Sequence, residues 1–172
     1  ELGSQLWSVA NTMAARRQLG VARQIFSVDL GGFDTHSNQA TTLPQLQQQM
    51  SAAITSFYSA LQELGLENQV TLFTASDFGR TLAVNDDGTD HGWGGHHFVI
   101  GGAVQGRQII GAMPPPTFGH NQDAGNGRLI PTTSVDQYAA ALGSWWGASD
   151  SALSEIFPNL KNFTKINGLF KS

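Results

Sequence analysis

The sequence contains no cysteine, which excludes disulfides, thiolate metal sites and a cysteine nucleophile. Charged residues are scarce as well, at 13% of 172 residues with a net charge of -4, against about 25% in an ordinary domain. Nucleic acids and anionic membranes require a basic patch, so we expect neither as a partner. No apolar run approaches the roughly 20 residues of a membrane-spanning helix, and we expect no membrane span.

Neutral polar residues replace the missing charges, since Asn, Gln, Ser and Thr together make up 50 of the 172 residues. Disordered chains usually combine high net charge with few apolar residues, so this composition predicts a folded chain. The length fits one domain of roughly 100–200 residues. A neutral polar surface is compatible with an extracytoplasmic protein or with burial against further segments of the protein, and composition leaves both open.

The first half of the chain has the pattern of a strand, a helix and a second strand. Residues 24–30 form a β-branched and aromatic run that ends at Gly31 and Gly32. Apolar residues at helical spacing predict a helix over 43–64, with Gly65 at its end. Residues 70–75 then form a second apolar run. This order is typical of a parallel sheet with a right-handed crossover, and therefore of an α/β fold.

The second half predicts less regular structure. We expect a loop over residues 81–95, short strands over 97–101 and 108–111, and an irregular segment over 113–127. A last helix is predicted from Thr133 or Ser134, either of which can be its N-cap, to residue 148. An N-terminal helix is indicated by the apolar spacing of residues 5–14.

Candidate metal ligands follow the first predicted strand. Ligands of open α/β sheets bind beyond the carboxyl ends of the strands, and Asp34 and His36 stand there, two residues apart. In extended backbone both side chains point to the same side. They supply half of a site for Zn²⁺ or a similar divalent ion, which Asp90 and His91 would complete.

Two further residues follow the second predicted strand. Asp77 is a candidate ligand of a second metal ion, and Arg80 suits a bidentate contact to an oxyanion. Such a site polarises a phosphoryl or sulfuryl oxygen. The competing interpretation is that these residues only form local turns, in which case Asp34, His36 and His91 should lie more than about 10 Å apart, far beyond the ~2 Å ligand bonds of zinc.

Other catalytic motifs are absent from the sequence. There is no Gly-x-Ser-x-Gly nucleophile motif, no Walker A sequence and no Gly-x-Gly-x-x-Gly after a strand. His96 and His97 are adjacent and would face opposite sides of an extended segment, so at most one of them joins the site. We expect His120 to be exposed.

Four motifs, in this order, resemble a bacterial family catalogued as domain of unknown function 1501, within the alkaline-phosphatase-like (sulfatase-like) superfamily. They occupy residues 31–39, 76–80, 88–94 and 128–138, and the tail at 157–160 is similar too. The resemblance implies a three-layer α/β/α domain with a mostly parallel sheet. It also implies twin-arginine export to the periplasm or beyond, and two divalent metals, with Asp34, His36 and His91 as ligands of one and Asp77 of the other.

The resemblance covers only the C-terminal part of such a domain, so residues 1–172 are expected to be an incomplete portion whose partner is an N-terminal segment carrying the nucleophile. It implies a metal-dependent phosphoester or sulfate-ester hydrolase. Where the phosphatases carry His after the second acid, this chain has Phe78. That departure favours an alternative, an exported binding or assembly protein that keeps the fold without catalysis.

Overall fold

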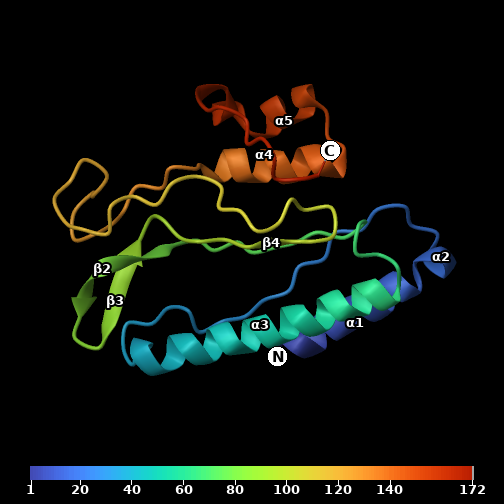
Figure 1. Ribbon diagram of the computed structural model, residues 1–172, viewed down its shortest axis with the longest axis horizontal. Coiled ribbons are helices and arrows are strands. Elements are labelled where there is room, and N and C mark those ends of the chain that lie inside the picture. The colour runs from blue at the N-terminus through green and yellow to red at the C-terminus, as the bar shows by residue number, and fades with distance from the viewer. Residues whose placement is uncertain (172) are drawn as a thin grey trace.

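A computed structural model describes residues 1–171 of the protein (Figure 1). Its elements, in chain order, are α1 (Leu2–Ala14), α2 (Arg16–Leu19), α3 (Gln39–Glu63), β1 (Leu72–Phe73), β2 (Gly79–Asn85), β3 (Gly88–Gly92), β4 (Val99–Ile100), α4 (Val135–Trp146), α5 (Asp150–Ile156) and the 3-10 helix η1 (Pro158–Asn162). Figure 1 shows α1 and α3 side by side, extended segments next to them, and α4 and α5 beyond.

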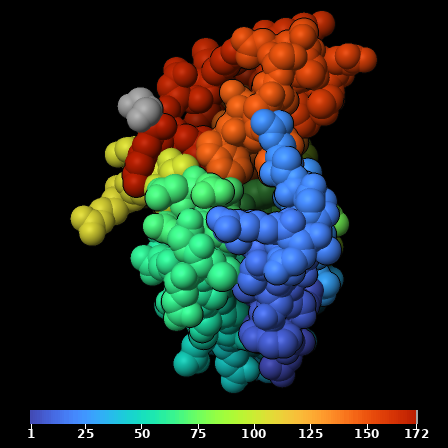
Figure 2. Space-filling model, turned by 90° about the vertical axis from the view of Figure 1, so that its right-hand side faces the viewer, coloured from blue at the N-terminus to red at the C-terminus, as the bar shows by residue number. Residues whose placement is uncertain are grey.

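The main core lies between α1 and α3. Leu6 and Val9 of α1 and Phe57 and Leu61 of α3 are buried, and Leu61 is only 2% exposed. These residues recur every three or four positions, which places them on one face of each helix. Figure 2 shows α1 in dark blue against the green C-terminal half of α3, with the light-blue segment after α2 rising toward the orange C-terminal helices.

Local sequence signals fix the end of α3 and the start of α4. Gly65 has a left-handed φ of 64°, and the amides of Leu66 and Gly65 donate to the carbonyls of Leu61 and Gln62, which is a Schellman motif. At the start of α4, the Ser134 hydroxyl accepts from the Gln137 amide while the Gln137 side chain accepts from the Ser134 amide. This reciprocal capping box confirms Ser134 as the N-cap of α4, while α3 ends at Glu63 with Leu64 as its C-cap and Gly65 as the next residue.

The prediction of a three-layer α/β/α fold with a mostly parallel sheet is wrong. Among residues 1–171 there are two sheets, each of two antiparallel strands: β1 with β4, and β2 with β3. Only Leu72 and Phe73 of the predicted second strand pair, and they pair with Val99 and Ile100. Of the other predicted strands, residues 108–111 form none, and Ile109 is 91% exposed.

Residues 24–30, the predicted first strand, show the physical reason. Their burial alternates along the segment, with Phe26, Val28 and Leu30 packed against the helical core and Ile25 81% exposed. No other backbone segment within residues 1–171 pairs with it as a strand. The side-chain amide of Gln5 in α1 instead donates to the Asp29 carbonyl at 2.8 Å and accepts from the Asp29 amide at 3.0 Å. The β-branched and aromatic run that predicted a sheet strand therefore packs on helices.

Residues 81–95 also differ from the predicted loop. Most of them belong to the hairpin of β2 and β3, whose strands are joined at Asp86 and Asp87. Asp86 has a positive φ of 76°, a conformation that Asp tolerates better than most residues. This hairpin carries Arg80 and His91, two of the predicted site residues. No helix in the described part of the chain is long and apolar enough to cross a membrane, as expected.

Candidate metal centre

The hairpin presents two side chains to the site. Arg80 of β2 and His91 of β3 are direct cross-strand partners, and such partners project from the same face of the ribbon. A register irregularity between Arg80 and Val84 separates this pair from the regular pairing near the turn. The sheet register therefore brings a guanidinium and an imidazole side by side.

The loop before α3 supplies the other two side chains. Thr35 is buried, and its carbonyl accepts the amide of Thr89 in β3 at 3.2 Å. Gly88 lies so close to the loop that a Cβ there would collide with the backbone of Thr35 and His36. Asp34 and His36, on either side of Thr35, both reach side chains of the hairpin: Asp34 contacts Arg80 and His91, and His36 contacts Asp90. The two side chains lie together as predicted, but the loop is bent and not extended, because the amides of Thr35 and His36 donate to the carbonyls of Phe33 and Asp34.

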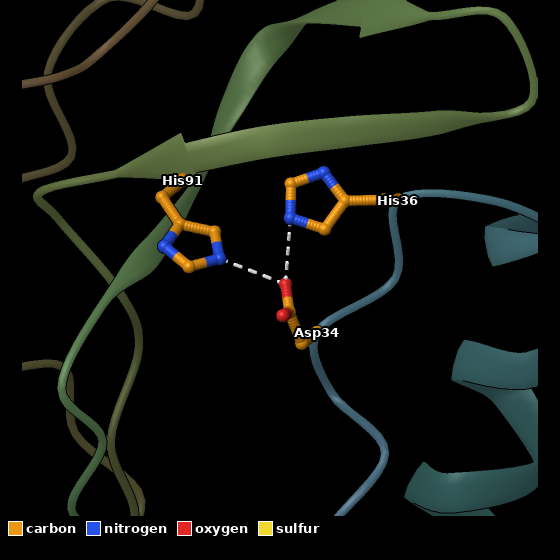
Figure 3. Close-up of side chains that lie close together, drawn as sticks. All are labelled: Asp34, His36 and His91. Carbon is orange, nitrogen blue, oxygen red and sulfur yellow. Dashed lines mark hydrogen bonds and ion pairs between the residues drawn. The ribbon is translucent and has the colours of Figure 1, made fainter.

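The three predicted ligands meet at one point (Figure 3). Asp34 Oδ1 lies 2.9 Å from His36 Nε2 and 2.8 Å from His91 Nε2. All three possible ligand atoms fall within 4.8 Å of one another. The interpretation that these residues form only separate local turns required more than about 10 Å between them, so the structure contradicts it.

Arg80 is directed at the same carboxylate. Its Nη1 donates to Asp34 Oδ1 at 2.8 Å, its Nε donates to Thr89 Oγ1 at 2.9 Å, and its Nη2 donates to the Thr89 carbonyl. The side chain is only 17% exposed. Arg80 therefore holds Asp34 against the hairpin, while its predicted contact with a substrate oxyanion stays a prediction.

Asp90 lies behind His36. Its Oδ1 is 3.5 Å from His36 Nδ1, the ring nitrogen opposite the one that faces Asp34. The side-chain amide of Asn85 donates to the same Asp90 oxygen at 2.6 Å. A carboxylate behind the distal nitrogen of a ligating histidine fixes the ring orientation and its tautomer. Asp90 thus occupies the place of a supporting carboxylate.

The electrostatics of the cluster favour a charged carboxylate. The hydrogen bond from His91, followed by that from Arg80, holds the pKa of Asp34 below its ordinary value, although burial acts in the opposite direction. Asp34 is 54% exposed and the two imidazoles 48%. An ionised carboxylate is the form that binds a metal.

The other predicted residues do not join this cluster. Asp77 is exposed and is not among the three residues whose ligand atoms converge. His97 instead contacts Thr74 Oγ1 at 3.3 Å and stacks on Tyr138. Burial, with a smaller effect of the charge on His96, lowers the pKa of His97, and burial raises that of Tyr138 to about 12. His120 was predicted to be exposed and is half-buried, with Nε2 2.9 Å from the Pro115 carbonyl.

Two residues of the cluster were not predicted from the sequence. Thr89 binds the guanidinium of Arg80 through its hydroxyl and its carbonyl, and the ring of Phe78 stacks on that of His91. A correct prediction of the β2–β3 hairpin would have identified Thr89, because Thr89 lies two residues before His91 on β3 and projects from the same face of the strand. The contact of Phe78, just before β2, has no local sequence signal.

The donor set fits a divalent ion. Two imidazole nitrogens and one carboxylate oxygen are the ligands of many zinc sites with an open fourth position. Ligand bonds of about 2.0–2.2 Å in a tetrahedron would separate the ligand atoms by roughly 3.4 Å, so the contacts to Asp34 need only a small widening. The three ligand side chains are about half exposed, and none of them lines the cavities of about 360 and 440 Å³ that involve α1, α3 and the Trp145–Trp146 region.

Comparison with known proteins gives one match. The sequence model of a family described as "Protein of unknown function (DUF1501)" matches residues 4–157. The chain belongs to this family. The match to DUF1501 includes Asp34, His36, Arg80 and His91, and so the whole cluster. No curated protein and no solved structure matches this DUF1501 chain.

Proposed function

We propose that this chain binds a divalent metal ion, with zinc as the best fit, through Asp34, His36 and His91. The observation that carries the proposal is the convergence of three ligand atoms, from a loop and a strand 57 residues apart in sequence, within 4.8 Å. The pairing of β2 with β3 and the close approach of Gly88 to the loop hold these parts together. The positions of the three ligands are therefore supported by backbone contacts between loop and hairpin as well as by the contacts between their side chains.

We further propose that the metal centre serves hydrolysis of a phosphoester or sulfate ester, as in the alkaline-phosphatase-like superfamily that the sequence resembles. A divalent ion there would supply Lewis-acid chemistry to an ester oxygen. Residues of this chain would support that chemistry: Arg80 and His91 keep Asp34 ionised, and Asp90 orients His36. Asp77 as ligand of a second ion, the nucleophile on a further segment, and export to the periplasm or beyond stay part of this proposal.

One observation favours the second candidate, an exported binding or assembly protein without catalysis. The three ligand side chains are about half exposed, whereas catalytic sites usually lie in concave, water-excluding pockets. In that case the metal would stabilise the junction of loop and hairpin or bind a partner.

The test is metal titration followed by an activity assay. Calorimetric titration with Zn²⁺ should show one tight site, which His36→Ala should lose and which His120→Ala, outside the cluster, should keep. The zinc-loaded full-length protein, which includes the further segment proposed to carry the nucleophile, is then assayed with p-nitrophenyl phosphate and p-nitrophenyl sulfate. Binding with hydrolysis supports the enzyme, binding without hydrolysis supports the second candidate, and no binding by the unmodified protein overturns both metal proposals.

A further inference from the structure

Phe78 touches two of the groups that meet at Asp34. Its ring lies flat on the imidazole of His91, with centroids 3.8 Å apart and planes inclined by 5°. On the same hairpin, the guanidinium carbon of Arg80 is 5.7 Å from the centre of the Phe78 ring. Phe78 is half-buried and directly precedes β2. One aromatic side chain thus contacts both the proposed ligand His91 and the cation that holds Asp34.

The stack constrains the orientation of His91. Rotation about χ2 of histidine is a soft, broad torsion, so the backbone of β3 alone does not fix the imidazole plane. The other aromatic neighbour, His36, is 5.1 Å away and tilted by 33°, which leaves Phe78 as the closer and flatter support. With the ring plane set by Phe78, the His91 Nε2 points at Asp34 Oδ1 at 2.8 Å.

The chemistry of a phenyl ring suits this place. It has no donor or acceptor, so it can neither ligate the metal nor compete with it for an imidazole nitrogen. Its π face attracts a cation, and arginine is the cation most often found there. An aliphatic side chain could fill the same space but would not impose a plane on the imidazole.

We propose that Phe78 is a positioning residue of the metal centre, whose flat ring orients the ligand His91 and the guanidinium of Arg80 toward one oxygen of Asp34. The proposal rests on the metal site proposed above. It assigns to Phe78 a part in metal affinity although Phe78 cannot itself bind the ion.

The test is Co²⁺ titration followed by the visible d–d absorption of bound cobalt, with Zn²⁺ competition for affinity. Supporting residues around a metal typically change affinity 10–100-fold, so Phe78→Leu should weaken binding by about 10-fold and alter the cobalt spectrum. Phe78→Tyr keeps the flat ring and should bind within about 3-fold of the unmodified protein. Phe163→Leu, the same change at an exposed phenylalanine outside the cluster, should have no effect.

The unfolding temperature of each metal-free variant separates positioning from folding. If Phe78→Leu does not fold, it is replaced by Phe78→Met, which keeps the apolar volume without a flat ring. If neither variant folds, Phe78 supports the fold, and the proposal is overturned. Unmodified affinity and spectrum in a folded Phe78→Leu overturn it while the metal site stands. Absence of cobalt and zinc binding in the unmodified protein overturns the metal site and this inference with it.

Discussion

Arg80 and His91, paired across β2 and β3, both place a nitrogen 2.8 Å from the same atom, Oδ1 of Asp34. One carboxylate oxygen therefore links a loop to both strands of a hairpin. Because these contacts come from cross-strand register, the electrostatic state of Asp34 depends on the hairpin being formed.

The first prediction concerns the pKa of Asp34. The hydrogen bond from His91 is the largest cause of its lowered pKa and that from Arg80 the second. His91→Gln should therefore raise the pKa of Asp34 toward its ordinary value by more than Arg80→Gln does. Carboxyl carbon NMR across an acid titration measures both shifts, with His120→Gln as a control that leaves Asp34 unchanged. Equal pKa values in all four proteins would contradict the assignment.

The second prediction concerns Asp90 as the support of His36. Asp90→Asn keeps an oxygen for the amide of Asn85 but removes the negative charge 3.5 Å from His36 Nδ1. Zn²⁺ affinity should fall by about 10-fold, the lower end for such supporting groups, because Asp90 is half exposed. Asp86→Asn, at the turn of the same hairpin, makes the same charge change away from the site and should bind like the unmodified protein. Calorimetry measures the Zn²⁺ affinity of both variants, and equal affinities would contradict the role of Asp90 as the support of His36.

The third prediction concerns the contact between loop and hairpin. A Cβ at Gly88 would overlap the backbone of Thr35 and His36, so Gly88→Ala must separate the loop from β3. Overpacking of this kind typically costs about 1–3 kcal/mol, and the same displacement should weaken metal binding. Gly106→Ala has open space around its Cβ and should change the free energy of unfolding by less than about 0.5 kcal/mol. Urea denaturation measures both, and equal stability of the two variants would refute the contact.

The sequence predicted the features that depend on nearby residues. The end of α3 at Gly65 and the start of α4 at Ser134 are set by motifs of four to six residues. Asp34 and His36 lie together as predicted, through two successive turns of the short loop and not through extended backbone. In each case the interacting groups lie within one turn or one short loop, so the local pattern determines the geometry.

Features that depend on distant pairing were not predicted. The apolar residues 70–75 have the composition of a buried strand, yet only Leu72 and Phe73 pair, and their partners in β4 lie 28 and 26 residues further along the chain. Residues 24–30 alternate like a strand but pack on α1 and α3, with Gln5 in place of a neighbouring strand. In the site, the contacts of Thr89 with Arg80 and of Phe78 with His91 depend on the β2–β3 hairpin. Its Asn-, Asp- and Gly-rich sequence is typical of a loop, so the hairpin was not predicted.

The last prediction concerns Asp123, which organises the irregular segment before α4. Its Oδ1 accepts the amides of Gly125 and Gly127 at 2.8 and 2.9 Å, and its Oδ2 accepts that of Gly119 at 2.9 Å. The bond from Gly119 is the largest cause of its lowered pKa. Asp123→Asn replaces one acceptor oxygen by a donor, so the unfolding temperature at pH 7 should fall by about 2–4 °C, the usual response of a chain of this size to the loss of one such bond.

The pH dependence tests the cause. The pKa of Asp123 is lower in the folded protein than its ordinary value of 3.8, so its stabilising effect is complete above pH 3.8 and is lost as the pH falls through the folded pKa. The difference in unfolding temperature between the unmodified protein and Asp123→Asn should therefore be constant from pH 7 to 5 and shrink below pH 3.8. Thermal melts by circular dichroism measure it, with Asp150→Asn, an exposed aspartate paired with Lys165, as control. A difference that persists undiminished at the lowest pH would show that the charge of Asp123 is not what holds this segment.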